Sequence, residues 1–353
     1  MNSREGRGGD GDGGPDRAGR NDRFRGPLRP RASRTANPAA DPDRTPEPDN
    51  AIVDEFVEDI VGPSRTYWGD AWGLLRASWL FWLSFGLIAV FVVMAVVPKV
   101  FTALEPGPDS PSGLYCELGN ARQPPTGEHW FGTDVQGCDY FVQVVSGARV
   151  SMIVAMFATL ITVVVGIFLG GLAGYYGGWA DSVISRLADG FFALPYLVGA
   201  IIVLSALTTQ QGRQVWHVTL AIGFLGWPSV VRLYRSTVLQ VKGLEYVQAA
   251  RALGAGDARI LYRHILPNAL APTLVYSTIS MGSVISVEAT LSFLGIGLPI
   301  DSISWGIMIA DASTLIVQSP YLLIFPGLFL VMASLGFVLM GEQLREAFDP
   351  RFR

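Results

Sequence analysis

The chain has 353 residues, half of them apolar and only 16% charged, and its formal net charge is −4. This composition excludes an ordinary soluble domain and is typical of a protein that crosses a membrane several times. The small net charge says little about partners.

Residues 1–50 differ in composition from the rest, because Gly, Pro, Arg and Asp dominate and large apolar residues are nearly absent. Such a segment cannot bury enough apolar surface to offset its ordering entropy, and it lacks the apolar core of a secretory signal. Residues 1–62 are predicted to be a disordered cytosolic tail, with a nucleic-acid- or lipid-binding arm as the alternative. Within the tail, apolar residues at helical spacing in residues 49–61 indicate a short acidic amphipathic helix.

Residues 63–79 combine tryptophans with arginines, among them Trp68, Trp72, Trp79 and Arg76. Tryptophan and arginine together are typical of the membrane–water interface. This stretch is predicted to be an interfacial amphipathic helix.

Six apolar segments then predict an all-α transmembrane domain over residues 80–341, followed by a short cytosolic tail at 342–353. The segments cover residues 80–97, 150–173, 190–207, 217–231, 269–287 and 321–340. Pro195 breaks the third segment, and residues 175–189 before it are predicted to be a connector. Gly166, Gly170 and Gly174 lie four apart in the second segment, a spacing that predicts close helix contact.

Positive charge is distributed unevenly over the predicted loops. Most arginines fall on one side, whereas the other side holds only Lys99, Arg122 and Arg213, with Arg149 at a boundary. By the positive-inside rule, both termini are cytosolic in a multi-pass protein of the cell membrane. The polar loop at residues 236–268 is then cytosolic, and the loop at 99–146 is extracytoplasmic.

The cytosolic loop has the pattern of a helix, a glycine break and a second helix. Residues 246–253 are rich in helix formers, Gly254 is suited to a C-terminal cap, and Asp257 is predicted to cap the next helix. Pro267 is tolerated where a following helix begins. Two short helices bent around a glycine predict a knob that fits a socket in a partner.

The motifs of several catalytic and binding sites are missing. The only lysines, Lys99 and Lys242, are not in a Gly-Lys-Ser/Thr sequence, and no G-x-S-x-G motif occurs. His129, His217 and His264 are scattered, so no metal site is predicted. The chain is not expected to be an enzyme, and energy from ATP would have to come from another chain.

Several sequence blocks in order resemble the permease subunits of ABC importers. Residues 248–267, with the pattern Q-A-A-x₃-G-x₉-H-I-L-P, resemble the E-A-A…G…I-x-L-P loop of that family, although Gln248 replaces Glu and His264 replaces Ile. Further blocks resemble those of peptide and nickel permeases at residues 129–139, 147–151, 174–178, 193–195, 288–295, 304–306 and 341–351. Over residues 65–353 the chain is similar to the C-type permease subunit of a dipeptide or oligopeptide importer, which implies a type I importer fold with six transmembrane helices.

The resemblance implies that the cytosolic loop forms coupling helices that dock on an ATPase. The residues so assigned are Glu245, Gln248, Ala249, Ala250, Arg251, Gly254, His264, Leu266 and Pro267. The small residues are expected to permit close docking, and Arg251 is expected to orient the contact. The implied partners are a homologous second permease, one or two cytosolic ATPase subunits that bind ATP and Mg²⁺, an extracytoplasmic substrate-binding protein, membrane lipid and a peptide substrate. No cofactor in this chain and no nucleic acid are expected.

Two further sets of residues are candidates for a role. Glu288 is the ionisable residue closest to the membrane interior, so with Ser292 and Phe293 it is a candidate for the pathway or a gate; an interfacial hydrogen bond is the alternative. Cys138 stands where the family block has Arg, and Cys116, the only other cysteine, lies in the same extracytoplasmic loop. Their confinement to this loop predicts a disulfide, and the alternative is two unrelated small residues.

Other functions remain open at this level. A nickel-chelate or other small-solute importer would use a similar permease. A gradient-driven secondary transporter would need paired charges or broken helices at the bilayer midplane, and Pro195 and Pro228 give breaks without charge pairs. A membrane receptor or anchor would account for the long tail but not for the coupling-like loop.

Overall fold

The computed structural model describes residues 67–102, 116–208, 212, 214–299 and 301–349. The predicted tail at 1–62 and its amphipathic helix lie outside these residues. Within the described ranges the chain is helical, with two isolated β-bridges and no strand.

The chain begins with two helices that meet at Ser78. Helix α2 (Tyr67–Ala77) leads to α3 (Trp79–Val96), which Ser78 caps by accepting a hydrogen bond from the Phe81 amide. The buried side of α2 packs against the end of α13 (Tyr321–Phe348). Trp72 and Trp79 are exposed, as an interfacial helix requires, and the interfacial location itself stays a prediction.

Helix α5 (Tyr140–Tyr176) has 37 residues and is therefore about 55 Å long. It starts ten residues before the predicted second span, because Asp139 caps it by accepting a hydrogen bond from the Val142 amide. The loop before it contains α4 (Lys99–Thr102) and a 3₁₀ turn (Leu118–Asn120).

The predicted connector at 175–189 is wrong, because these residues largely belong to α6 (Gly178–Phe192). Pro195, which lacks an amide hydrogen and disfavours helix in the residue before it, separates α6 from α7 (Tyr196–Leu207). The two helices are bent by 98°. The predicted third span is thus divided between the end of α6 and α7, and α7 with 12 residues is too short to cross a membrane by itself.

The remaining elements complete the chain. They are α8 (Val215–Lys242), α9 (Glu245–Ala252), α10 (Asp257–Arg259), a π-helical segment η2 (Ile260–Ile265), α11 (Leu266–Phe293), α12 (Trp305–Ala312), a 3₁₀ turn η3 (Ser313–Leu315) and α13.

Four helical stretches among the described residues are long and apolar enough to cross a membrane. They are Trp79–Val96, Tyr140–Tyr176, Asp257–Phe293 and Tyr321–Phe348. A fifth is reached if the bent pair of α6 and α7 forms one span. The chain is an all-α multi-pass membrane protein, and the count of six spans stays a prediction.

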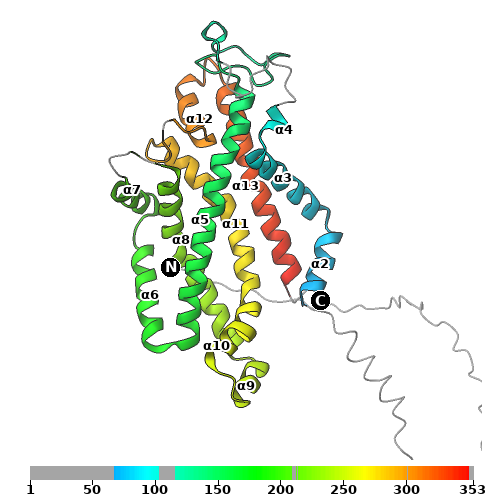
Figure 1. The fold of residues 1–353 in the computed structure, drawn as a ribbon, viewed down its shortest axis with the longest axis vertical. Coiled ribbons are helices and arrows are strands. Elements are labelled where there is room, and N and C mark those ends of the chain that lie inside the picture. Colours follow the sequence, from blue (N-terminus) through cyan, green and yellow to red (C-terminus); the bar gives the residue numbers. More distant parts are fainter. Residues whose placement is uncertain (1–66, 103–115, 209–211, 213, 300, 350–353) are drawn as a thin grey trace, which may run out of the picture. The chain divides into compact units, whose positions relative to one another are not determined.

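Helix α5 lies against α8 through the predicted glycines (Figure 1). A Cβ atom on Gly166 would lie 2.4 Å from the Val230 Cβ, and one on Gly170 would lie 2.9 Å from the Val231 carbonyl oxygen. Gly174 faces Val238 in the same way. The predicted helix contact is confirmed, and its partner is α8.

A second cluster of buried residues joins α3, α5, α11, α12 and α13. Trp305 at the start of α12 is fully buried there, and its indole Nε1 donates a hydrogen bond of 2.9 Å to the Val144 carbonyl. Its ring lies edge-on to Phe91. This cluster fixes α12 between the long helices.

We expect Gly166→Ala to destabilise the protein by about 1–3 kcal/mol, because the added methyl group has to displace the stiff Val230 side chain. Gly86→Ala in α3 is the matched control, since no atom lies within 4 Å of its added Cβ. Thermal unfolding in detergent measures both variants. Equal midpoints for the two would contradict the close α5–α8 contact.

Candidate functional site

The segment at residues 245–267 joins α8 to α11, and α9 ends within it at a glycine. The Ala255 amide donates to the Ala250 carbonyl at 3.1 Å, and the Gly254 amide donates to the Arg251 carbonyl at 3.0 Å. These two bonds form a Schellman motif, which needs a left-handed residue, and Gly254 has φ of 83°. No atom of the chain lies within 4 Å of a Cβ placed there, so neighbouring atoms do not exclude a side chain. The positive φ is the reason that a glycine is needed at this position.

The predicted cap at Asp257 is wrong. Gly256 is the N-cap residue of α10, and no side chain caps this helix. The Asp257 carboxylate instead accepts a hydrogen bond of 2.6 Å from the Tyr175 hydroxyl at the end of α5. The sequence pattern missed this because the competing donor lies 82 residues away.

The second predicted short helix is the beginning of a long one. α10, η2 and α11 run without a break from Asp257 to Phe293. In η2 the Leu266 amide donates to the Leu261 carbonyl, five residues back. This wide turn immediately precedes Pro267, which has no amide hydrogen to donate and would crowd a regular helix, so the helix continues past the proline.

The inner side of the 245–267 segment is apolar and well packed. Val247, Ile260 and Ile265 are fully buried in one cluster with Tyr234 and Val238 of α8. Two side chains add polar ties: the Gln248 amide donates to the Lys242 carbonyl at 3.0 Å, and the Tyr246 hydroxyl donates to the His264 carbonyl at 3.3 Å. The segment therefore has a firm base against α8.

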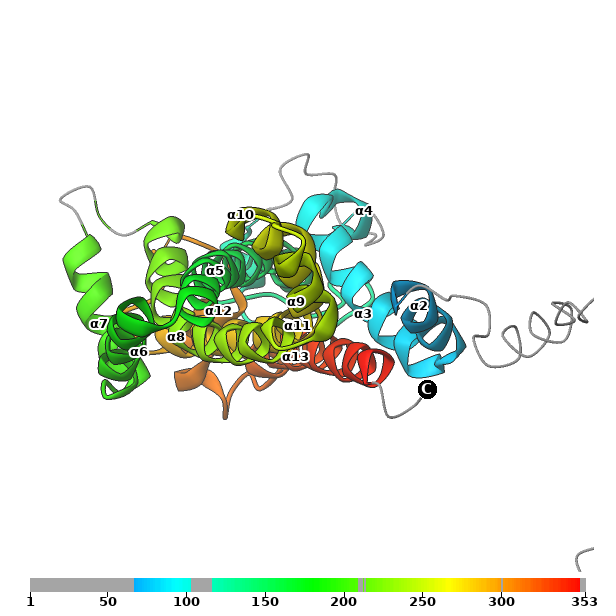
Figure 2. The same cartoon turned by 90° about the horizontal axis from the view of Figure 1, so that it is seen from below.

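The predicted docking residues differ in exposure. The exposed ones are Glu245, Gln248, Ala249, Arg251, Gly254 and Pro267, and the half-buried ones are Ala250, His264 and Leu266. All lie on this segment, at the end of the molecule where α9 and α10 project below α5 and α11 (Figures 1 and 2).

Two exposed apolar side chains were missed by the sequence reasoning. Leu253 is 89% exposed at the end of α9, and Tyr262 is 66% exposed in η2. Arg259 and Arg263 are exposed nearby in the sequence. The sequence did contain a signal for Leu253, because a leucine directly before the capping glycine of a polar loop is a candidate for an exposed apolar contact.

Glu288 lies inside the chain and joins three elements. Its side chain is fully buried, and it accepts hydrogen bonds from the hydroxyls of Ser151 in α5 at 3.1 Å, Ser292 in α11 at 2.9 Å and Ser304 at 3.3 Å. Ser304 is the N-cap of α12 and accepts from the Ile307 amide. Glu288 and Ser292 therefore face neighbouring helices in this structure, whereas Phe293 of the predicted set is exposed.

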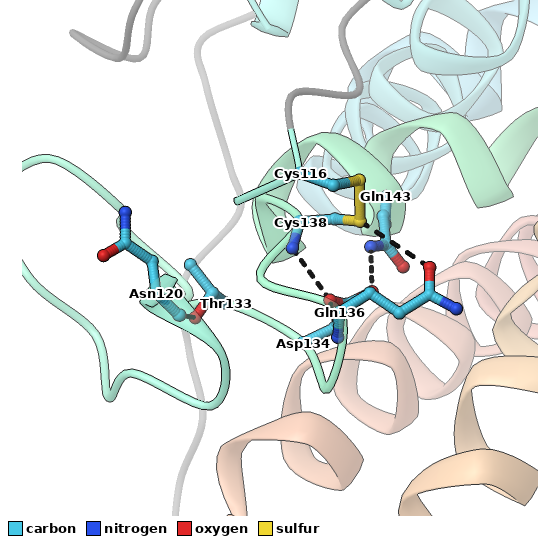
Figure 3. Close-up of a disulfide and its surroundings, with 7 residues drawn as sticks. All are labelled: Cys116, Asn120, Thr133, Asp134, Gln136, Cys138 and Gln143. Carbon is cyan, nitrogen blue, oxygen red and sulfur yellow. Dashed lines mark hydrogen bonds between the residues drawn. A yellow bond between two sulfur atoms is a disulfide. The ribbon is translucent and has the colours of Figure 1, made fainter. Parts of the chain in front are cut away.

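Cys116 and Cys138 form a disulfide in the loop before α5 (Figure 3). The neighbouring Asp134 organises the turn: its carboxylate accepts from the Gln136 and Cys138 amides, each at 2.8 Å, and from the Gln143 side chain at 2.6 Å. The disulfide thus closes a turn that is already held to the start of α5.

The same loop is attached to two long helices. His129 Nδ1 lies 2.6 Å from the carboxylate of Asp139, the residue that caps α5. Phe131 stacks on Phe325 of α13 with ring centroids 3.9 Å apart, and the Tyr321 hydroxyl donates to the Thr133 carbonyl at 2.9 Å. The loop is a folded unit between α5 and α13.

Among the residues that the structure describes, no three His, Cys, Asp or Glu side chains form a group that could hold a metal ion. Two of the histidines have partners within the chain. His129 pairs with Asp139, and His217 accepts a hydrogen bond from the Gln214 amide.

Comparison with known proteins places the chain in a family. Residues 163–353, more than half of the chain, match the family described as "Binding-protein-dependent transport system inner membrane component". The chain belongs to this family. This permease is 36% identical to the dipeptide transport system permease protein DppC of Alkalihalophilus pseudofirmus, over 89% of this chain and 98% of that protein.

Two other relatives of this permease have related names. It is 34% identical to the oligopeptide transport system permease protein OppC of Bacillus subtilis, over 84% of this chain and 94% of that protein. It is 36% identical to the glutathione transport system permease protein GsiD of Pectobacterium atrosepticum, over 68% of this chain and 78% of that protein.

We expect the permease to react with a thiol reagent only after reduction, when it is isolated folded from its native envelope, because both thiols are joined in the disulfide. Closing a loop with a sequence separation of 22 contributes about 3 kcal/mol in the chain-entropy model. Cys116→Ser and Cys138→Ser are controls that each leave one thiol free. Equal labelling of the unsubstituted protein with and without reductant would contradict the disulfide.

We expect Glu288→Ala to lower the free energy of unfolding by about 3 kcal/mol, because three buried hydroxyls lose their acceptor. Glu288→Gln keeps one acceptor oxygen and should lose about half as much. Thermal unfolding in detergent is the measurement, with the exposed Glu128→Ala as control. A Glu288→Ala variant as stable as that control would contradict a stabilising role for these three hydrogen bonds.

Proposed function

We propose that this chain is a permease subunit of an ATP-driven, binding-protein-dependent importer of dipeptides or oligopeptides. The observation that supports it is the 245–267 segment, which combines a firmly packed base with an exposed apolar tip at Leu253. The family membership and the names of the relatives support the substrate class.

In this proposal the chain supplies half of the translocation pathway and a homologous permease supplies the other half. An extracytoplasmic binding protein delivers the peptide, and one or two ATPase subunits bind ATP and Mg²⁺ in the cytosol. The sequence of this chain has no Gly-Lys-Ser/Thr motif, so ATP binding falls to those subunits. Both termini and the 245–267 segment are cytosolic, in accord with the distribution of arginine.

The 245–267 segment docks on the ATPase in this proposal. A docking element has to resist displacement, and the burial of Val247, Ile260 and Ile265 supplies that resistance. Leu253 is the apolar anchor, because a leucine that is 89% exposed at a helix end gains most from entering a partner's pocket. Ala249 leaves room for close approach on the exposed side of α9.

Two other candidate sites have roles in this proposal. Glu288 holds α12 against α5 and α11 beside the outward part of the pathway, as a positioning residue. The disulfide loop is a folded extracytoplasmic unit.

We expect Leu253→Asp to reduce the amount of ATPase that co-purifies with the complete transporter at least tenfold, because a carboxylate cannot enter an apolar pocket.

Gly254→Trp should abolish peptide uptake while membrane insertion stays normal, because the residue needs positive φ and lies at the docking surface. Retention of the ATPase is measured in mild detergent, and uptake is measured in cells.

Leu118→Asp is the matched control, because Leu118 is 81% exposed on the other loop. It should leave the bound ATPase unchanged. If Leu253→Asp retained as much ATPase as this control, or if Gly254→Trp imported peptide normally, the docking role would be excluded.

A further inference from the structure

We propose that Tyr175 and Asp257 form the link that holds the 245–267 segment to α5, and that Tyr175 is a positioning residue for coupling. The inference rests on the proposed function, because it concerns how movement of the docking segment reaches the transmembrane helices. The sequence patterns predicted a different role for Asp257, as a helix cap, and none for the Tyr175 side chain.

Tyr175 contacts the segment on several sides. Its hydroxyl donates to the Asp257 carboxylate at 2.6 Å, and the guanidinium of Arg251 lies beside the same hydroxyl. Its backbone carbonyl accepts a hydrogen bond from the Lys242 ammonium, which also lies 5.3 Å from the centre of the Tyr175 ring. One side chain at the end of α5 thus reaches the last residue of α8, the last turn of α9 and the first residue of α10.

The tyrosine end of this link is buried, whereas its charged end, Asp257, is exposed. Tyr175 is only 4% exposed and belongs to the apolar cluster that also holds Val247 and Ile260. A short hydrogen bond from a hydroxyl to a carboxylate is stronger than one between neutral groups. Tyr176, the next residue, is 58% exposed, so adjacent tyrosines have opposite environments.

The link connects the segment to the whole length of α5. Gly166, Gly170 and Gly174 of α5 pack directly against Val230, Val231 and Val238 of α8, and this close fit couples the two helices in this half. The other end of α5 starts at Asp139, beside the disulfide loop. A displacement of α10 is therefore passed through Tyr175 to a helix that ends on the opposite side.

The test uses the complete transporter in liposomes, with radiolabelled dialanine as the probe. The measured quantity is the amount of dialanine imported per ATP hydrolysed. We expect Tyr175→Phe to lower this ratio about tenfold, because it removes a charge-assisted hydrogen bond while keeping the ring. Asp257→Ala should have the same effect, and the double variant should be no worse than either single one, since both remove one interaction. Tyr176→Phe, which removes an exposed hydroxyl, should leave the ratio unchanged.

A merely structural role would lower the amount of folded transporter without changing the ratio. An unchanged ratio in Tyr175→Phe, or effects of the two substitutions that multiply in the double variant, would overturn the proposal. If the unsubstituted transporter hydrolyses ATP but imports no dialanine, the proposed import of dipeptides fails. Hydrogen exchange at residues 245–259 in the same complex then decides the link: about tenfold faster exchange in Tyr175→Phe than in Tyr176→Phe supports it, and equal exchange overturns it.

Discussion

Helices α5 and α8 approach each other closely at three successive turns, where atoms of α8 occupy the space that a side chain on α5 would need. Gly166, Gly170 and Gly174 make this approach possible, because any Cβ at the first would collide with Val230. In lipid, apolar surface gives little net attraction between helices, so close backbone contact and van der Waals packing hold them together. The position of α8 fixes the start of α9, and α5 supplies both Tyr175 and the cap at Asp139. The docking segment at one end and the disulfide loop at the other are thus both placed by this contact.

Buried polar groups determine the remaining geometry. Glu288 takes its three hydroxyl partners from α5, α11 and the start of α12, and Trp305 donates to a backbone carbonyl of α5. Because Glu288 and Trp305 are buried, they depend on these protein partners, and the hydrogen bonds form only when the helices lie in this relative position. These hydrogen bonds fix the position of α12 relative to α5 and α11, whereas apolar packing alone would let the helices slide along one another.

The sequence predicted well what local patterns determine. The glycine spacing identified a helix contact, and the pattern around Gly254 correctly predicted that a helix ends at this glycine. The docking role of the 245–267 segment is a proposal, and the pathway or gate role of Glu288 stays a prediction, since both concern partners and substrate.

The failures involved contacts distant in sequence. Asp257 was expected to cap its own helix, but a tyrosine from α5 takes its carboxylate. Pro267 was expected to start a new helix, but the π-helical turn before it lets the preceding turns join α11. Residues 175–189 were predicted to be a connector, yet those from Gly178 onward belong to α6, where Asp181 pairs with Arg235 of α8. Val183, Ile184, Leu187 and Phe191 recur at helical spacing in α6, so the sequence did contain an apolar periodicity that predicts this helix.

The disulfide has a consequence for the order in which the molecule matures. Disulfides form in oxidising compartments, so in the proposed orientation Cys116 and Cys138 can join only after the loop has crossed the bilayer. The start of α5 has to be outside by then, because the bridge closes beside the residue that caps this helix. Once the bond exists, the bridged loop is a bulkier object than a single extended strand and resists being drawn back through the membrane. In that orientation, oxidation would keep the loop on the side of the membrane where the bond formed.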